Sequence, residues 1–355
     1  MASKGKSKKQ HQIALLTVAG LAETTLKALH GANGPTGRVL KLPNHDLILL
    51  SRCDEETLRQ TSLIEDSFML LGKPLTIRAN KDLVALDRIV SEREITAAID
   101  LRKRLFPGRT VKRVSFNTYL KQDTDRKVYR KQIVARVNQL VQQRFRKWRL
   151  QDPALLELWG FFIDEKLYLG VRLTDERVRY NFHRPVLRKG ALRPTVAAAM
   201  AYLISPSRGE LIVDPMCGTA TLIQECVALQ PEGRYICGDR SPAAVRLSQD
   251  RLGTTASDVI CWDALSLPLR RTSVDGFICN MPFGRQYGAG EAIDRLYLDL
   301  LKHWLTLLTP AGRMLIMVAD GVLSERALRD VRCRFHCVAK VKLLGMWTRL
   351  YRIEN

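Results

Sequence analysis

The sequence predicts an α/β fold in which the carboxy-terminal half forms an open, largely parallel β-sheet. Four short apolar runs in this half each end at a polar residue, at Asp214, Asp239, Asp263 and Asn280. Segments with helical spacing separate most of these runs, and this alternation predicts successive strand–helix units. Such sheets bind ligands beyond the carboxyl ends of their strands, so the four polar residues are expected to meet at one edge.

The first of these strands leads into a loop of small residues. Glu210–Val213 predicts the strand, Leu222–Leu229 predicts the start of a helix, and the loop between them is Asp214-Pro215-Met216-Cys217-Gly218-Thr219-Ala220-Thr221. Gly218 lets the backbone approach a ligand closely. The patterns G-x-x-x-x-G-K and G-x-G-x-x-G are both absent from the sequence. The loop is therefore predicted to bind a nucleoside without either phosphate-binding motif.

The next two strands also end at acidic residues. Arg234–Gly238 leads to Asp239, whose carboxylate only accepts hydrogen bonds and suits two ribose hydroxyls. Ser257–Trp262 leads to Asp263, which can accept from an adenine amino group. One such acid would usually be a helix cap or a loop charge. Three acids at consecutive strand ends favour a nucleoside site.

The fourth strand ends at the most informative tetrapeptide of the chain. Val274–Cys279 predicts a buried parallel strand, and Asn280-Met281-Pro282-Phe283 follows it. The Asn280 amide oxygen and the Met281 carbonyl can accept hydrogens from a planar amine. The Phe283 ring can stack on the base that carries the amine. A strand that simply ends in a turn would explain the tetrapeptide alone, but the neighbouring acids favour an amine site.

Positive charge is concentrated before this half of the chain. The net charge is +21 and the pI is about 9.9. From Arg102 to Arg149, 16 lysines and arginines stand against the two acids Asp123 and Asp125. This excess indicates a polyanionic partner. A predicted amphipathic helix, Val128–Leu150, carries the candidate RNA-binding residues Arg130, Lys131, Arg136, Arg144, Lys147 and Arg149.

Cysteine usage suits a reducing compartment. The sequence has eight cysteines and no C-x-x-C pair, and Cys237, Cys261 and Cys279 fall in apolar strand runs where buried cysteines are expected. The segment Cys333-Arg-Phe-His336-Cys337 offers three metal ligands without an evident fourth, so no metal site is predicted. The sequence shows no secretory signal and no stretch able to span a bilayer, so a soluble cytoplasmic protein without a membrane partner is expected.

The amino-terminal half predicts two smaller α+β modules after a basic disordered tail, residues 1–11. The first, residues 12–90, is a ferredoxin-like unit. The second, residues 91–176, ends in a hairpin, and a basic connector, residues 177–195, leads to the last domain, residues 196–355. The predicted elements are strand Ile13–Val18, helix Gly20–His30, hairpin Val39–Leu42 and Leu47–Ser51, helix Glu55–Leu71, strand Val111–Asn117, hairpin Leu155–Ile163 and Lys166–Leu173, and the closing strands Gly312–Ala319, Val338–Leu344 and Trp347–Ile353.

The carboxy-terminal pattern resembles the Rossmann-like class I fold of S-adenosylmethionine-dependent methyltransferases. The loop from Asp214 resembles the D-P-x-C-G-[ST]-G-T loop of RNA guanine-N2 methyltransferases, and the tetrapeptide from Asn280 resembles their N-P-P-F/Y motif. Ala220 stands where that family usually has its second glycine. Met281 replaces the more usual proline or leucine, although its backbone carbonyl is unchanged.

The amino-terminal pattern resembles the RNA-binding part of the same family. Residues 156–171 resemble the closing hairpin of THUMP domains, and residues 16–21 resemble the start of proteins in which a ferredoxin-like unit precedes a THUMP domain. In the connector, Arg188, Gly190, Leu192 and Pro194 match an R-x-G-x-L-x-P segment of the family. An exposed linker would explain that segment equally well.

The resemblance implies an enzyme that forms N2-methylguanosine in RNA, with tRNA as the expected substrate. A ribosomal or small nuclear RNA substrate, a protein glutamine-N5 methyltransferase and a non-catalytic RNA-binding protein remain alternatives. If the source is eukaryotic or archaeal, a small zinc-binding activator subunit is also implied. The implied catalytic residues are Asn280, Met281, Pro282 and Phe283, and those implied to bind S-adenosylmethionine are Asp214, Pro215, Met216, Cys217, Gly218, Thr219, Asp239, Arg240, Asp263 and Ala264.

Overall fold

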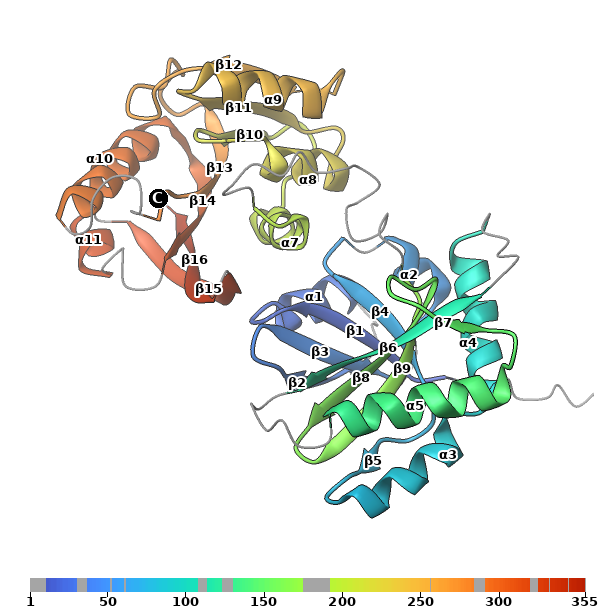
Figure 1. Cartoon of the computed structure of the whole chain (residues 1–355). Coiled ribbons are helices and arrows are strands. Elements are labelled where there is room, and N and C mark those ends of the chain that lie inside the picture. The colour runs from blue at the N-terminus through green and yellow to red at the C-terminus, as the bar shows by residue number, and fades with distance from the viewer. Residues whose placement is uncertain are drawn as a thin grey trace, which may run out of the picture. The chain divides into compact units, whose positions relative to one another are not determined.

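The structure is a computed structural model of the 355-residue chain. It describes residues 11–30, 37–51, 53–60, 62–107, 114–122, 130–174, 192–255, 257–283, 291–319, 325–331, 333–343 and 345–354. The chain divides into two compact units (Figure 1). The first comprises residues 1–22 and 29–183, and the second comprises residues 23–28 and 184–355. The predicted basic tail up to residue 10 and the connector up to residue 191 lie outside the described residues.

The amino-terminal unit is built on one nine-stranded sheet, in the order β2-β3-β1-β4-β9-β8-β6-β7 with β5 paired to β9. Its strands are β1 (Ile13–Val18), β2 (Gly37–Lys41), β3 (His45–Leu50), β4 (Asp66–Leu70), β5 (Leu75–Thr76), β6 (Ser115–Gln122), β7 (Arg149–Leu150), β8 (Leu156–Ile163) and β9 (Lys166–Arg172). The helices in this part of the sequence are α1 (Ala22–His30), α2 (Glu55–Gln60), the 3-10 helix η2 (Asn80–Ala85), α3 (Leu86–Ile89), α4 (Glu92–Leu105) and α5 (Arg130–Arg144). Because β4 pairs with both β1 and β9, the sheet is continuous across both predicted modules.

Both predicted hairpins of this unit are present. β2 and β3 pair antiparallel from Gly37 and Leu50 to Lys41 and Asp46. β8 and β9 pair antiparallel up to Ile163 and Lys166. The two residues between β8 and β9, Asp164 and Glu165, have φ of 49° and 60°. A two-residue turn with both central φ values positive matches the right-handed twist of the strands that it joins.

The predicted helix Glu55–Leu71 is wrong beyond Gln60. The helix α2 ends at Gln60, and the apolar run Phe68-Met69-Leu70 lies in strand β4. Every residue of β4 is buried, since the strand lies between β1 and β9 in the sheet. A short apolar run fits a buried strand and a buried helix equally well by periodicity.

The predicted helix Val128–Leu150 is also too long. The helix α5 ends at Arg144, Lys147 lies in a turn, and Arg149 lies in the short strand β7. The Trp148 N–H donates to the Phe145 carbonyl at 2.9 Å, which closes the turn. The rings of these two residues stack with centroids 3.9 Å apart. β7 then pairs in parallel with the start of β6, a long-range contact that helical spacing cannot reveal.

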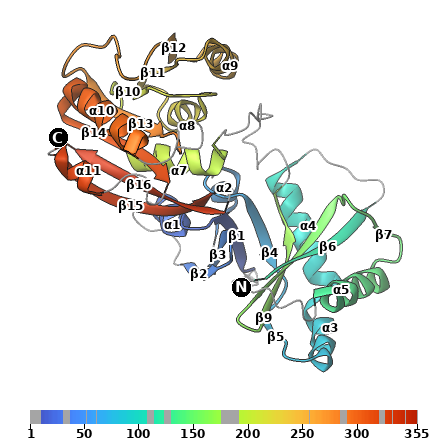
Figure 2. The same ribbon diagram turned by 60° about the vertical axis from the view of Figure 1, so that its left-hand side comes forward.

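The carboxy-terminal unit is a seven-stranded sheet in the order β12-β11-β10-β13-β14-β16-β15 (Figure 2). The first five strands in this order are parallel, whereas β16 runs antiparallel to both of its neighbours, β14 and β15. The strands are β10 (Leu211–Asp214), β11 (Arg234–Asp239), β12 (Ser257–Cys261), β13 (Val274–Asn280), β14 (Leu308–Ala319), β15 (Arg334–Leu343) and β16 (Met346–Glu354), and the helices are α7 (Pro194–Ile204), α8 (Thr221–Leu229), α9 (Pro242–Leu252), α10 (Glu291–Leu307) and α11 (Glu325–Asp330). The predicted strand–helix succession is confirmed, and the strand order reverses between β10 and β13.

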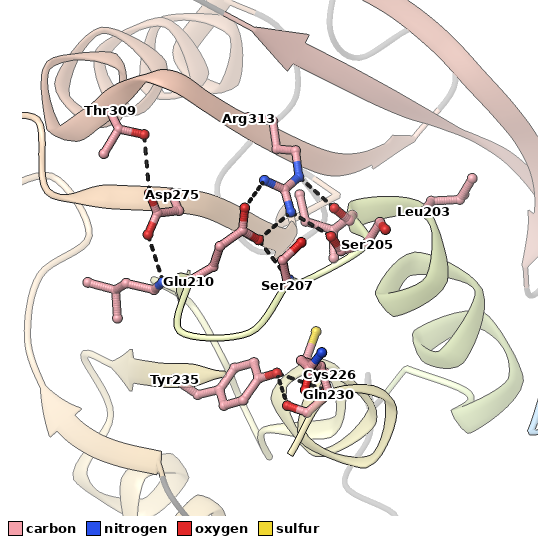
Figure 3. A network of polar contacts seen from close by, with 12 residues as sticks. Leu203, Ser205, Ser207, Glu210, Cys226, Gln230, Tyr235, Asp275, Thr309 and Arg313 are labelled. Carbon is pink, nitrogen blue, oxygen red and sulfur yellow. Dashed lines mark hydrogen bonds and ion pairs between the residues drawn. The ribbon is translucent and has the colours of Figure 1, made fainter. Parts of the chain in front are cut away.

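A buried ionic cluster ties the start of this unit together (Figure 3). Arg313 of β14, 9% exposed, donates to the carbonyls of Ile204 and Ser205, each at 2.6 Å. The same guanidinium pairs with Glu210 at 2.7 Å. Asp275 of β13 accepts the Leu211 N–H at 2.9 Å. These bonds fix the carboxyl end of α7 and the beginning of β10, the strand that ends at Asp214.

Candidate active site

A cavity of about 480 Å³ lies at the carboxyl ends of β10, β11 and β13. It brings together all ten residues that the family resemblance implied for the cofactor, together with Asn280 and Pro282 of the tetrapeptide. Met281 and Phe283 are not among its lining residues. The remaining lining comes from residues that the sequence did not single out as site residues: Leu192, Thr221, Leu222, Ser241, Ala244, Leu265, Leu296 and Leu300.

The loop after β10 is held by one hydrogen bond to β11 and one from a side chain that follows β12. The Cys217 N–H donates to the Gly238 carbonyl at 2.9 Å, and the Trp262 indole N–H donates to the Pro215 carbonyl at 3.1 Å. Gly218 has φ +58°, and no atom lies within 4 Å of the point where a Cβ would stand. A ligand can therefore approach the backbone at Gly218 without meeting a side chain.

Ala220 occupies a strained position at the start of α8. It is the helix N-cap, its φ is 53° and its side chain is fully buried. The left-handed conformation costs an L-residue other than glycine about 1–2 kcal/mol. The family that the sequence resembles usually has glycine at this position. Replacement of glycine by Ala220 therefore introduces backbone strain into the loop that lines the cavity.

Asp239 accepts two backbone hydrogen bonds and still has acceptor capacity. Its Oδ2 accepts the Gly218 N–H at 3.1 Å, and its Oδ1 accepts the Ser241 N–H at 2.9 Å. A carboxylate has about four lone-pair sites, so a vicinal pair of hydroxyls could add to these bonds. The two N–H contacts hold the carboxylate in one orientation at the end of β11.

Asp263 and Asp214 occupy opposite environments. Asp263 is exposed, and its Oδ1 accepts the Leu265 N–H at 2.9 Å. Asp214 is 1% exposed and accepts the Met216 N–H at 3.2 Å. Burial raises the pKa of Asp214 well above its ordinary value, and the nearby Cys217 and Asp239 raise that pKa further. A cationic group in the cavity would relieve this penalty by pairing with the ionised carboxylate.

The tetrapeptide presents an unsatisfied acceptor. Asn280 is the last residue of β13, and its Oδ1 atom is buried without a hydrogen-bond partner among the described residues. Buried polar atoms are nearly always hydrogen-bonded, so this atom points to a ligand donor. The Met281 N–H donates to the Met317 carbonyl at 2.9 Å, which extends the pairing of β13 with β14 beyond Asn280.

Tyr297 supports the tetrapeptide from α10, and sequence reasoning missed it. The Tyr297 side chain is fully buried, and its hydroxyl donates to the Pro282 carbonyl. Phe283 follows at a half-buried position. In an amphipathic helix, an aromatic residue that only packs in the core and one that also holds a loop in place occur at the same spacing. Periodicity therefore does not separate the two roles. The only signal was its hydroxyl, since a buried tyrosine needs a hydrogen-bond partner.

The candidate RNA-binding residues divide into two groups. Arg130, Lys131, Lys147 and Arg149 are exposed. Arg136 pairs with Asp87 of α3 at 2.6 Å, and Arg144 donates to the Asp87 carbonyl at 3.2 Å and to the Leu140 carbonyl at 3.1 Å. These contacts fix α5 against α3, and they give Arg136 and Arg144 a structural role that competes with RNA binding.

Two of the three cysteines predicted to be buried are buried. Cys237 and Cys279 are buried, whereas Cys261 is exposed, so that prediction is wrong. Cys261 lies on β12, the edge strand of the sheet, where one face has less cover. Within the described ranges, no group of three His, Cys, Asp or Glu side chains could hold a metal ion. No helix in those ranges is long and apolar enough to cross a membrane.

Residues 182–349 match the family model UPF0020: RMKL-like, methyltransferase domain. This match and the sheet order define the carboxy-terminal unit as a methyltransferase domain. The whole chain also resembles the crystal structure of TrmN from Thermus thermophilus, with a TM-score of 0.78 and 22% identity over 97% of this chain and 99% of that chain. That likeness shows the fold.

Two curated relatives are guanine-N2 methyltransferases by name. The tRNA (guanine(6)-N2)-methyltransferase of Thermus thermophilus is 31% identical over 195 residues, 54% of this chain and 58% of the relative. The human tRNA (guanine(6)-N(2))-methyltransferase THUMP3 is 29% identical over 187 residues, 48% of this chain and 36% of the relative. The matched segments thus span less than two thirds of either relative. Neither name points to a zinc-binding activator subunit, which stays a prediction.

Proposed function

We propose that the protein transfers a methyl group from S-adenosylmethionine to the N2 amine of a guanosine in tRNA. The observation that carries this proposal is the buried Asn280 Oδ1, which has no hydrogen-bond partner in the described part of the chain, at a cavity lined by three acidic residues. The methyltransferase domain, the names of the relatives and the motif from Asn280 support the same reaction.

The residues of the cavity fit S-adenosylmethionine by their chemistry. Asp239 would accept from the ribose hydroxyls, and Asp263 would accept from the adenine amine. The buried Asp214 suits the cationic methionine part, because an opposite charge offsets the burial of its carboxylate. Gly218 leaves room for the backbone to approach the ligand. When bound, the sulfonium supplies an activated methyl group, and its loss leaves a neutral thioether.

The tetrapeptide would orient the amine. The N2 lone pair of guanine is delocalised into the ring, so the amine is a poor nucleophile. Hydrogen bonds accepted by the Asn280 Oδ1 and the Met281 carbonyl would localise the lone pair and align it with the methyl group. Tyr297 would keep the loop in place through the Pro282 carbonyl, and Phe283 would stack on the base. The amine proton then leaves to water.

Transfer RNA is the substrate that the amino-terminal unit favours. Its strands and closing hairpin follow the THUMP-like pattern of the sequence, and α5 and its continuation carry the exposed cations Arg130, Lys131, Lys147 and Arg149. Lysine and arginine side chains bind phosphate groups and release counterions. Both curated relatives named above act on tRNA according to their names.

Replacing Asn280 tests the assignment of the amine site. In Asn280→Ala, the single-turnover rate of methyl transfer to a tRNA transcript should fall about 10²–10³-fold. Affinity for S-adenosylmethionine and for tRNA should stay close to wild type, because the contact strengthens mainly in the transition state. Phe283→Ala should instead also weaken tRNA binding through lost stacking.

Mass spectrometry of the digested tRNA identifies the product. N2-methylguanosine from the wild-type reaction supports the proposal, whereas methylation of a different nucleoside, or of a protein glutamine alone, contradicts it. A wild-type rate in Asn280→Ala would remove the tetrapeptide from the reaction. Thermal unfolding of both variants shows whether any loss comes from misfolding.

A further inference from the structure

The hairpin of β15 and β16 reaches the catalytic edge of the sheet. In the registers of the sheet, Asn280 of β13 lies opposite Met317 of β14, and Met317 lies opposite Leu350 of β16. β16 runs antiparallel to β14, so Trp347 lies three residues before Leu350 and beyond the level of Asn280. Strand spacings of about 4.8 Å and a rise of about 3.3 Å per residue place the Cα atoms of Asn280 and Trp347 about 14 Å apart.

Trp347 is a large aromatic side chain in contact with water. It is 45% exposed, whereas Tyr351 and Ile353, further along the same face of β16, are buried in the core. The hairpin is held without it, since the Thr348 hydroxyl donates to the Val341 carbonyl at 2.9 Å and the Phe335 and Tyr351 rings pack edge to face. Among the residues that the structure describes, almost half of the Trp347 side chain is therefore accessible to a partner.

Positive charge surrounds this ring. Lys342 pairs directly across from Trp347, and its Nζ lies 6.0 Å from the centroid of the indole ring. Lys340, on the same face of β15 as Lys342, is exposed and lies opposite Arg349. The acidic residue of the two strands, Glu354, lies at the other end of β16, opposite Arg313 and Arg334. The end of the hairpin near Asn280 is thus cationic and aromatic.

This combination matches single-stranded nucleic acid. A nucleobase stacks on an aromatic ring whatever its sequence, and cationic side chains beside the ring bind the phosphates. A target base can enter a cavity only after it leaves its stack, so the neighbouring nucleotides lose a stacking partner. The separation of about 14 Å between the Cα atoms of Asn280 and Trp347, estimated from strand geometry, suits contact with such a neighbour.

We propose that the β15–β16 hairpin is a second RNA contact of this enzyme. The Trp347 ring stacks on an unpaired base close to the target guanosine, and Lys342 and Lys340 bind the adjoining phosphates. This inference rests on the proposed function, and it adds to it a contact on the catalytic unit itself, separate from the basic residues of the amino-terminal unit.

Substitutions on the hairpin test the contact. Trp347→Ala should weaken tRNA binding or lower kcat/KM for tRNA about 5- to 100-fold, which is the range for the removal of one base stack. Trp347→Phe should retain most of the affinity because it keeps a ring. Lys340→Ala combined with Lys342→Ala should reduce the slope of log Kd against log salt by about 0.7–0.9 for each phosphate group that is no longer bound. Affinity for S-adenosylmethionine should not change in any of these variants.

A matched control lies at the opposite edge of the sheet. Arg271 is exposed before the start of β13, and Arg271→Ala should leave tRNA binding unchanged. If wild-type protein methylates tRNA and Trp347→Ala keeps wild-type Kd and kcat/KM, the hairpin contact is overturned while the proposed function stands. If the wild type binds and methylates no RNA but methylates a protein, both the contact and the proposed function are wrong.

Discussion

Asp214 carries a carboxylate that the fold removes from water before any ligand binds. Burial raises the pKa of Asp214, and Cys217 and Asp239 raise it further. In the unfolded chain the group ionises near its ordinary value. The native state therefore loses stability as pH rises from that value towards the raised pKa, and the loss is complete above the raised pKa.

Asp214→Asn should accordingly stabilise the protein in the absence of cofactor. We expect a gain of about 1 kcal/mol or more at pH 8, because burial disfavours the ionised carboxylate and a neutral amide does not carry this penalty. The gain should shrink as the pH is lowered towards 4. Binding of S-adenosylmethionine should weaken in the same variant. Urea unfolding across this pH range measures the stability, and calorimetry measures the affinity for S-adenosylmethionine. A destabilised variant with normal cofactor binding would contradict the role assigned to Asp214.

The positions of individual residues can be predicted from the sequence where strand ends determine them. Asp214, Asp239 and Asn280 line one cavity because parallel strands place their carboxyl ends at the same edge. Tyr297 could not be predicted, since its contact with the Pro282 carbonyl depends on how α10 packs across β13. Arg136 and Arg144 have the spacing of solvent-facing cations, and their contacts with Asp87 depend on tertiary structure.

At the scale of elements, Arg313 joins strand β14 to the segment between α7 and β10, which lies 103 to 109 residues earlier in the sequence. Arg313 bonds the end of α7 and also Glu210, which directly precedes β10. Its guanidinium lowers the pKa of Glu210, so this pair stabilises the fold above pH 4.5 and the contribution is lost as pH falls through the lowered pKa. The cluster therefore sets the position of the strand that carries Asp214.

Arg313→Ala should destabilise the protein by about 3 kcal/mol, because it leaves Glu210 and two helix carbonyls without their partner. Chemical denaturation at pH 7 measures this loss. The wild-type advantage should decrease as the pH falls from 4.5 through the lowered pKa of Glu210. The control Arg208→Ala breaks an exposed pair with Glu232 and should cost less than about 1 kcal/mol. Equal losses of unfolding free energy in Arg313→Ala and Arg208→Ala would show that burial does not strengthen the Arg313–Glu210 pair.

Helices and strands could be predicted from the sequence where the hydrophobic pattern extends over enough residues. The carboxy-terminal strands were predicted within a few residues, since each is an apolar run bounded by turns or helices. The run in β4 was too short to separate a strand from a helix. β7 has two residues and exists because it pairs with β6, so no local pattern could have marked it.

On the scale of the whole molecule, the net charge of +21 is expected to act through the exposed residues near α5. Reversing the charge of Lys147 and Arg149 should flatten the salt dependence of tRNA binding by about 0.7–0.9 in log–log slope for each phosphate group that is no longer bound. Arg144→Ala should instead lower stability, because Arg144 contacts α3. Fluorescence anisotropy between 50 and 300 mM salt, roughly the range over which such effects are large, tests this.

Arg270 provides the control for this measurement. It is exposed just before β13, at the edge of the sheet opposite the cavity. Reversing its charge should leave the slope unchanged. The prediction for Lys147 and Arg149 is wrong if their reversal changes the slope no more than the reversal of Arg270.

The position of β4 between β1 and β9 has a consequence for synthesis on the ribosome. β9 follows β4 by about one hundred residues, which take roughly 5–20 s to translate. Until Arg172 emerges, the nascent chain presents Phe68, Met69 and Leu70 on an open strand edge. Open edges recruit other strands. The amino-terminal unit can thus complete its sheet only after nearly all of it has been made, and chaperone cover during that interval would protect it from aggregation.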